Sequence, residues 1–123
     1  MKTGVGSDRA VGSAALSSRE SSTSSATTST KTLYLIRHGR TEMNDYLHVN
    51  HWAAPDFTDP GLYDTRLTEV GRRQAASLRA VTAALAPPPQ VLVASPLSRA
   101  LMTAELAFEG TYDGPKLVCA LAR

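Results

Sequence analysis

Apolar residues along this chain gather into short continuous runs that alternate with helical stripes. The two clearest runs are residues 33–36 (Leu-Tyr-Leu-Ile) and 91–94 (Val-Leu-Val-Ala). Short apolar runs bounded by turn signals are typical of strands buried in a parallel sheet. A further strand is predicted near residues 117–119, where Leu, Val and Cys follow one another. The hydrophobic pattern therefore predicts at least two buried strands.

Two amphipathic helices are predicted around the second strand. Thr68 is the expected N-cap of the first helix, and the prolines at positions 87–89 are expected to end it. Ser95 is the expected cap of the second, with Pro96 in its first turn. Apolar residues recur at helical spacing in both. The expected buried stripes are Val70, Ala75, Leu78, Val81 and Leu85 in the first helix and Leu97, Leu101, Ala104 and Phe108 in the second.

The order of these elements predicts the fold class. Strands that alternate with helices favour an α/β fold, here three layers (α/β/α) with a mostly parallel sheet. A helix or structured loop is expected to begin at residues 40–44, and the Pro- and Asp-rich residues 48–64 are expected to form an irregular loop.

The N-terminal segment has a different composition from the rest. Nine of the ten residues 21–30 are Ser or Thr, which leaves little apolar surface to offset the entropy of ordering. We therefore predict a disordered tail over residues 1–31 and a folded part over residues 32–123. The tail resembles an organelle transit peptide, and a plain disordered extension is the alternative. The expected location is intracellular: the cytoplasm, or an organelle such as the chloroplast if the tail is a transit peptide.

Charge and cysteine content exclude several classes of partner. The formal net charge of +2 lies in the tail, and charges cancel from Thr32 onward, so no basic face for nucleic acid is expected. No apolar run approaches the roughly 20 residues of a membrane span. One cysteine, Cys119, excludes an internal disulfide and fits a reducing compartment. These features predict no nucleic-acid or membrane partner and leave the oligomeric state open.

Candidate chemistry follows both buried strands. Arg37 and His38 come directly after the first, and Arg99 lies shortly after the second. The carboxyl ends of parallel strands meet at one edge of a sheet, so these three side chains are expected to converge. Guanidinium groups bind phosphate oxygens, and a neutral imidazole can attack phosphorus. We also expect the backbone N–H groups after Gly39 to be free to bind phosphate.

Three ordered segments resemble the histidine phosphatase superfamily, which has the phosphoglycerate mutase-like fold. They are residues 37–41 (Arg-His-Gly-Arg-Thr) with Asn44, residues 67–75 (Leu-Thr-Glu-Val-Gly-Arg-Arg-Gln-Ala) and residues 95–104 (Ser-Pro-Leu-Ser-Arg-Ala-Leu-Met-Thr-Ala). The resemblance implies a phosphatase or mutase-like phosphotransferase that acts on a small-molecule phosphomonoester through a phosphohistidine. No metal or organic cofactor is implied, since the arginines neutralise the phosphate charge.

The resemblance also implies roles for individual residues. His38 is the expected nucleophile, and Arg37 and Arg99 are expected to hold the phosphoryl oxygens. Thr41 and Asn44 are expected to contact the phosphate or the rest of the substrate.

Two parts of the family pattern are missing. The carboxylate that serves as general acid is expected where this chain stops, near residues 121–123, and the second pocket histidine has no candidate. Residues 32–123 are therefore expected to be the N-terminal part of a histidine phosphatase domain, in a truncated chain. Two functions stay open: a phosphoryl-transfer enzyme, or a truncated non-catalytic phosphate-binding or interaction protein.

The loop at residues 48–64 raises one further possibility. His48 and His51 suggest a metal site with Asp45 or Asp56, but their spacing suits ligation only on a regular helix, which prolines and glycine disfavour. We therefore predict no metal site. Three aromatic residues of this loop are expected to anchor it against the core: Trp52, Phe57 and Tyr63.

Overall fold

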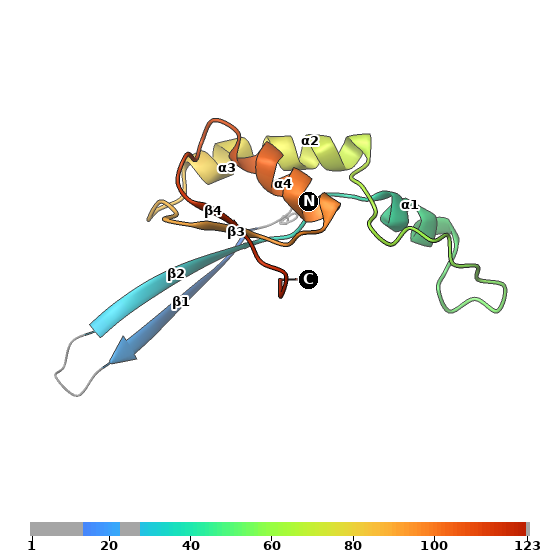
Figure 1. Ribbon diagram of the computed structural model, residues 1–123, viewed down its shortest axis with the longest axis horizontal. Coiled ribbons are helices and arrows are strands. Elements are labelled where there is room, and N and C mark those ends of the chain that lie inside the picture. The colour runs from blue at the N-terminus through green and yellow to red at the C-terminus, as the bar shows by residue number, and fades with distance from the viewer. Residues whose placement is uncertain (1–13, 23–27, 123) are drawn as a thin grey trace. The chain divides into compact units, whose positions relative to one another are not determined.

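The computed structural model describes residues 14–22 and 28–122, which fall into two compact units (Figure 1). The first unit ends at Arg37 and the second begins at His38. The first is a β-hairpin, and the second contains helices and a small parallel sheet. The fold is therefore α/β, as the sequence predicts. Within the described ranges, no helix is long and apolar enough to cross a membrane.

The hairpin pairs β1 (Ala14–Ser22) with β2 (Thr28–Ile36) in antiparallel register. The apolar run at 33–36 is a strand, as predicted, but Leu33 and Leu35 are each more than half exposed. β1 and the start of β2 lie within the segment that is predicted to be a tail. The start of β2 is rich in Thr, whose β-branched side chain suits extended backbone. The rest of that predicted tail, residues 1–13 and 23–27, lies outside the described residues.

The second unit contains the parallel strand pair that the sequence predicts. The strands are β3 (Leu92–Ala94) and β4 (Lys116–Val118), with Val93 opposite Leu117. The connection between them contains α4 (Ser98–Phe108). This helix packs against β3 and, on its other side, against the helices that precede β3 (Figure 1).

The helix predicted after Thr68 is present but interrupted. It forms α2 (Glu69–Ser77) and α3 (Arg79–Ala83), which meet at Leu78. Thr68 is the N-cap, as predicted, and accepts a hydrogen bond from the Gly71 backbone. Ala75 and Leu78 are buried as expected, whereas Val70 and Val81 are 42% and 45% exposed. In α3 the buried residue is Thr82.

The start of α4 also differs from the prediction. The helix begins at Ser98, and Ser95 accepts a hydrogen bond from the Leu97 backbone without capping it. The prediction that Ser95 caps this helix is therefore wrong. The buried face differs as well, because Leu101 is exposed. The buried residues of α4 are Thr103, Ala107 and Phe108.

The loop before α2 is irregular, as predicted, and follows α1 (Glu42–Val49). Phe57 packs edge-on against Tyr46, with ring centroids 6.1 Å apart. Trp52 and Tyr63 are 70% and 82% exposed, so the prediction that they anchor the loop to the core is wrong. Ring stacking explains part of the difference, because Trp52 lies against the neighbouring His51 ring, outside the core.

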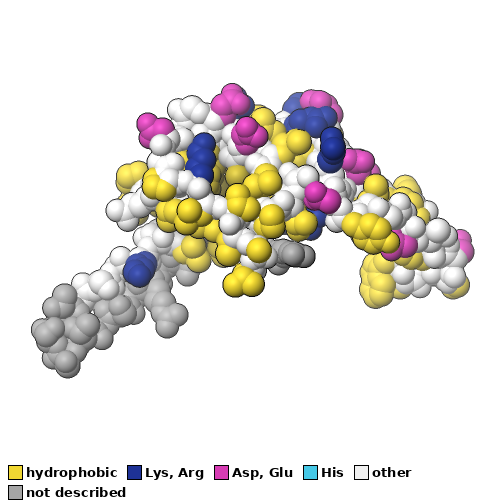
Figure 2. Space-filling model, viewed as in Figure 1, with side chains coloured by type: hydrophobic (Ala, Val, Ile, Leu, Met, Phe, Trp, Pro, Cys, Tyr) yellow, Lys and Arg dark blue, Asp and Glu magenta, His cyan; other side chains and the backbone are white. Residues whose placement is uncertain are grey.

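Apolar side chains around the parallel strands remain accessible. Figure 2 shows hydrophobic side chains gathered on the viewed face of the second unit. Around the strands, these exposed residues are Val91, Val93, Leu117 and Val118. Apolar side chains of both strands are therefore accessible.

Candidate active site

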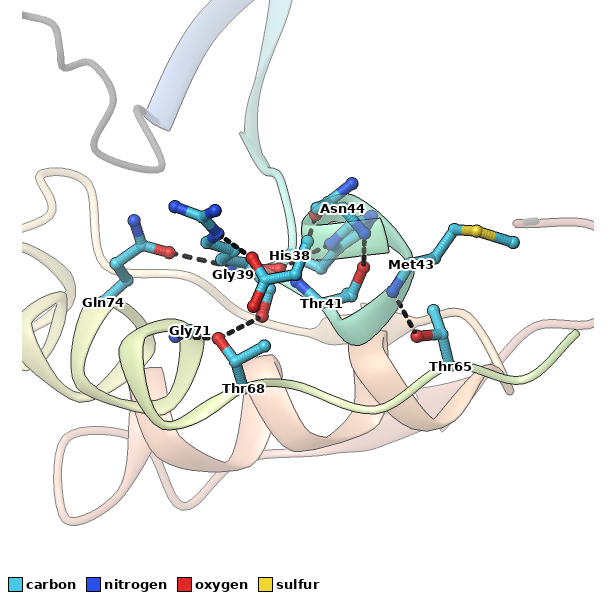
Figure 3. A network of polar contacts seen from close by, with 11 residues as sticks. His38, Gly39, Thr41, Met43, Asn44, Thr65, Thr68, Gly71 and Gln74 are labelled. Atoms are coloured by element: carbon cyan, nitrogen blue, oxygen red, sulfur yellow. Dashed lines mark hydrogen bonds and ion pairs between the residues drawn. The ribbon is translucent and has the colours of Figure 1, made fainter. Parts of the chain in front are cut away.

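Residues 38–41 form the loop that carries the candidate nucleophile, and three successive backbone amides fix it. Gly39 N donates to Thr103 Oγ1 of α4 at 3.1 Å. Arg40 N donates to Gln74 Oε1 of α2 at 2.9 Å, and Thr41 N donates to Asn44 Oδ1 of α1 at 3.0 Å (Figure 3). The prediction that these N–H groups are free for phosphate is therefore wrong. Side chains of the surrounding helices satisfy these amides.

The ring of His38 has a defined orientation and tautomer. Its Nδ1 lies 2.8 Å from the carbonyl oxygen of Gly39 (Figure 3). A carbonyl oxygen can only accept a hydrogen bond, so Nδ1 carries the proton of the neutral ring. The lone pair is then on Nε2, which is the atom able to attack an electrophile.

Two hydrogen bonds connect the residue after His38 to the backbone of Arg99. The hydroxyl of Thr103 accepts from Gly39 N and donates to the carbonyl oxygen of Arg99 at 2.7 Å. Arg99 lies in the first turn of α4 and is half-buried, and His38 is also half-buried. The structure thus holds the candidate nucleophile and one candidate phosphate clamp on directly connected backbone segments.

Thr41 and Asn44 form the capping box that begins α1. The Thr41 hydroxyl accepts from Asn44 N at 3.2 Å, while the Asn44 amide oxygen accepts from Thr41 N. Thr41 is only 1% exposed. A contact with substrate stays a prediction for both residues. A contact of Asn44 with phosphate oxygens would come from its amide nitrogen, because only this atom of the side chain can donate a hydrogen bond.

A close approach of two glycines brings α2 against the loop. A Cβ atom on Gly71 would lie 2.8 Å from the Arg40 nitrogen and would overlap the Arg40 carbonyl oxygen. A Cβ atom on Gly39 would overlap the Gly71 backbone in turn. Thr68 N also donates to the Arg40 carbonyl oxygen at 2.9 Å. The glycines therefore allow a contact between two backbones, with no side chain between them.

Comparison with known protein families identifies the family of this chain. Residues 33–117 match the family model of the histidine phosphatase superfamily (branch 1), a range that contains the whole His38 loop and α4. The chain belongs to the histidine phosphatase superfamily. Membership indicates phosphoryl transfer in general, with phosphatase or mutase-type activity. No curated protein and no solved structure matches the chain significantly.

Three further residues that the sequence analysis considers for phosphate or metal binding are exposed: Arg37, His48 and His51. Arg37 is the last residue of the first unit and is exposed. His48 and His51 are also exposed, and His51 Nδ1 accepts from the Ala53 backbone at 3.2 Å. Among the described residues, no group of three or more His, Cys, Asp or Glu side chains is placed to hold a metal ion.

Asp64 is a residue of the histidine phosphatase domain that the sequence indicates only as part of a turn. Its carboxylate accepts from Ser98 N at 2.9 Å and from Ser98 Oγ at 2.6 Å. It therefore caps α4 in place of Ser95. Sequence reasoning missed this cap because it comes from a separate segment, 34 positions away. Nothing in the sequence next to α4 identifies Asp64 as its cap.

The same contacts lower the pKa of Asp64. The hydrogen bond from the Ser98 hydroxyl has the largest effect, followed by that from the Ser98 backbone, and the charges of Arg99 and Arg66 add to it. The ionised carboxylate is thus favoured in the folded protein. This stabilises the N-terminal turn of α4, which carries Arg99.

The lowered pKa of Asp64 predicts a pH dependence of stability. The carboxylate stabilises the fold above its ordinary pKa of 3.8, and this stabilisation is lost as the pH falls through the lower folded-state pKa. We expect the free energy of unfolding of the wild type to exceed that of Asp64→Asn at neutral pH, and the difference to shrink at acidic pH. Urea unfolding across this pH range measures it.

The matched control for this prediction is Asp113→Asn, which removes an exposed carboxylate from the turn after α4. Its difference from the wild type should change less with pH than that of Asp64→Asn. If the curves of the wild type and Asp64→Asn stay parallel down to low pH, the contacts with Ser98 do not stabilise the ionised form.

Proposed function

We propose that this protein is a phosphoryl-transfer enzyme that acts on a phosphomonoester through a phosphohistidine at His38. The observation that carries the proposal is the hydrogen bond from His38 Nδ1 to the Gly39 carbonyl oxygen. This bond supports the neutral tautomer that leaves a lone pair on Nε2 for attack on phosphorus. Membership in the histidine phosphatase superfamily supports the same reaction class.

The reaction proceeds in two displacements at phosphorus. Nε2 of His38 attacks the phosphorus atom, and the bond from phosphorus to the ester oxygen breaks, which releases the alcohol as its anion. In the second step the oxygen of water or of an acceptor hydroxyl attacks phosphorus, and the bond from phosphorus to Nε2 breaks with its electron pair left on Nε2. The proton of the attacking group passes to solvent and balances the proton that the released alkoxide takes up. Water as acceptor gives a phosphatase, and a substrate hydroxyl gives a mutase.

Charge neutralisation is the task of the arginines. Arg99 lies in the first turn of the helix whose Thr103 holds the His38 loop, and Arg37 directly precedes His38 in the chain. Two guanidinium groups can bind the phosphoryl oxygens with paired, charge-assisted hydrogen bonds. The proposed reaction needs no metal or organic cofactor for this purpose.

Protonation of the leaving group limits the rate with alkyl phosphates. An alkoxide must be protonated as it leaves, and a positioned acid accelerates this step roughly 10²- to 10⁴-fold. A nitrophenolate ion leaves without protonation. If water is the proton source, we expect this chain to react much faster with 4-nitrophenyl phosphate than with an alkyl phosphate.

A second candidate function is a non-catalytic phosphate-binding or interaction protein. The accessible apolar residues beside β3 and β4, with Val93 and Leu117 each at least half exposed, favour it. Such a surface suits contact with another protein segment. A protein of this kind would bind phosphate without forming an adduct.

The experiment is to trap the phosphohistidine. The protein is mixed with 4-nitrophenyl phosphate carrying labelled phosphorus, quenched with base and digested for peptide mapping. We expect an acid-labile, base-stable label on the peptide that contains His38. The absence of a label in folded protein would contradict the proposed enzyme. If the same sample binds inorganic phosphate, the second candidate is supported.

A further inference from the structure

Thr103 is a buried polar residue whose hydroxyl group both accepts and donates a hydrogen bond. Its side chain is 3% exposed, on the face of α4 that packs against the rest of the second unit. The Gly39 amide can only donate, so the hydroxyl oxygen must accept from it. The hydroxyl proton is then directed to the Arg99 carbonyl oxygen. One side chain thus joins the loop of the nucleophile to the turn that carries the phosphate clamp.

Thr103 differs in this respect from the other residues that hold the loop. Gln74 holds the Arg40 amide from α2, and Asn44 holds the Thr41 amide from α1. Neither bond reaches the helix that carries Arg99. Among the three amide contacts of the loop, the bond to Thr103 is therefore the one that relates His38 to Arg99.

We propose that Thr103 is a positioning residue that sets the separation between His38 and Arg99. The inference rests on the phosphoryl transfer proposed above. Reacting groups must lie within a few tenths of an ångström of the productive geometry, and a displacement of about 1 Å can cost roughly 10²-fold in rate. Thr103 acts through the backbone of these two residues and does not touch the substrate.

The chemistry of the hydroxyl group determines which replacements are tolerated. Serine keeps both the donor and the acceptor, so Thr103→Ser preserves the link from Gly39 to Arg99. Valine has the shape of threonine but neither function, so Thr103→Val leaves the Gly39 amide without a partner. We expect the loop to shift toward another acceptor or toward water in that variant.

A matched control is available in Thr82. Thr82 lies in α3 and is also buried, at 4% exposed. Its hydroxyl donates to the carbonyl oxygen of Ala107 in α4, the helix of Thr103, at 2.7 Å. Thr82→Val therefore removes a comparable buried hydrogen bond to α4, more than one turn away from Arg99. A general loss of stability should affect both valine variants in the same way.

The experiment compares the wild type, Thr103→Val, Thr103→Ser and Thr82→Val in phosphate release from 4-nitrophenyl phosphate, with thermal melting of each. We expect Thr103→Val to lower kcat by roughly 10²-fold with a smaller change in KM, because alignment matters most in the transition state. Thr103→Ser should keep most of the activity. Thr82→Val should lower the melting temperature and leave kcat close to that of the wild type.

The outcomes separate this inference from the proposed function. If the wild type forms no phosphohistidine, the proposed function fails and the role of Thr103 fails with it. If the wild type is active and Thr103→Val loses no more activity than Thr82→Val, the inference alone is overturned. Should Thr103→Val not fold, Thr103→Ala takes its place, with the same loss of kcat expected and the same comparison deciding.

Discussion

Replacing His38 with alanine should abolish phosphoryl transfer, with a fall in rate of roughly 10⁴- to 10⁶-fold, the range seen when a covalent nucleophile or its partner is removed. The reason is that Nε2 of His38 forms the bond to phosphorus in the proposed reaction. The ring is half-buried, and its described hydrogen bond goes to the neighbouring Gly39 carbonyl. Loss of activity should therefore occur without unfolding, as measured by phosphate release and by thermal melting of the same sample.

The chain supplies its own controls for this result. His48 at the end of α1 and His51 in the following loop are both exposed, so His48→Ala and His51→Ala should leave the rate nearly unchanged. Added imidazole should restore part of the activity of His38→Ala, since it can fill the space of the missing ring. If His38→Ala keeps the wild-type rate, the nucleophile is another group and the proposed mechanism is wrong.

Replacing Gly71 with alanine should destabilise the protein by about 3 kcal/mol, the upper part of the range for overpacking. In an exposed helix the same change would stabilise by up to roughly 1 kcal/mol, because alanine favours the helix. The opposite sign arises because the added Cβ would overlap the Arg40 backbone, which has no flexible side chain to move aside. Urea unfolding followed by circular dichroism measures the difference.

Gly110 is the matched control for Gly71. Its φ of 71° is unfavourable for alanine, but no atom lies within 4 Å of the position of an added Cβ. Gly110→Ala should therefore cost only the backbone penalty of about 1–2 kcal/mol. If Gly71→Ala is no more destabilising than Gly110→Ala, the loop and α2 do not approach each other as closely as described.

The sequence predicted the elements that depend on interactions between residues close together in the chain. The apolar runs correspond to the second half of β2 and to β3, and Thr68 caps α2 because its hydroxyl reaches the Gly71 amide three residues on. The motifs that resemble the histidine phosphatase superfamily were confirmed at the level of the family. Each of these predictions needs only a short stretch of chain.

The features that the sequence did not predict depend on contacts between distant segments. Asp64 caps α4 from outside the helix, so Ser95 was the wrong residue. Thr103 is buried where periodicity favours Leu101, because its hydroxyl has partners that only the folded chain supplies. The amides after Gly39 were expected to bind phosphate for the same reason, since nothing nearby in sequence identifies Gln74 as the acceptor of the Arg40 amide.

The loop at residues 38–41 has a consequence for how the second unit opens. Its amides are bound in sequence order by α4, α2 and α1, one helix for each residue. An amide exchanges its hydrogen with solvent when the helix that holds it detaches, so neighbouring amides can differ in protection. The exchange rates of Gly39, Arg40 and Thr41 therefore record the detachment of three different helices. A comparison of the exchange rates of these three adjacent amides gives the order in which the helices detach.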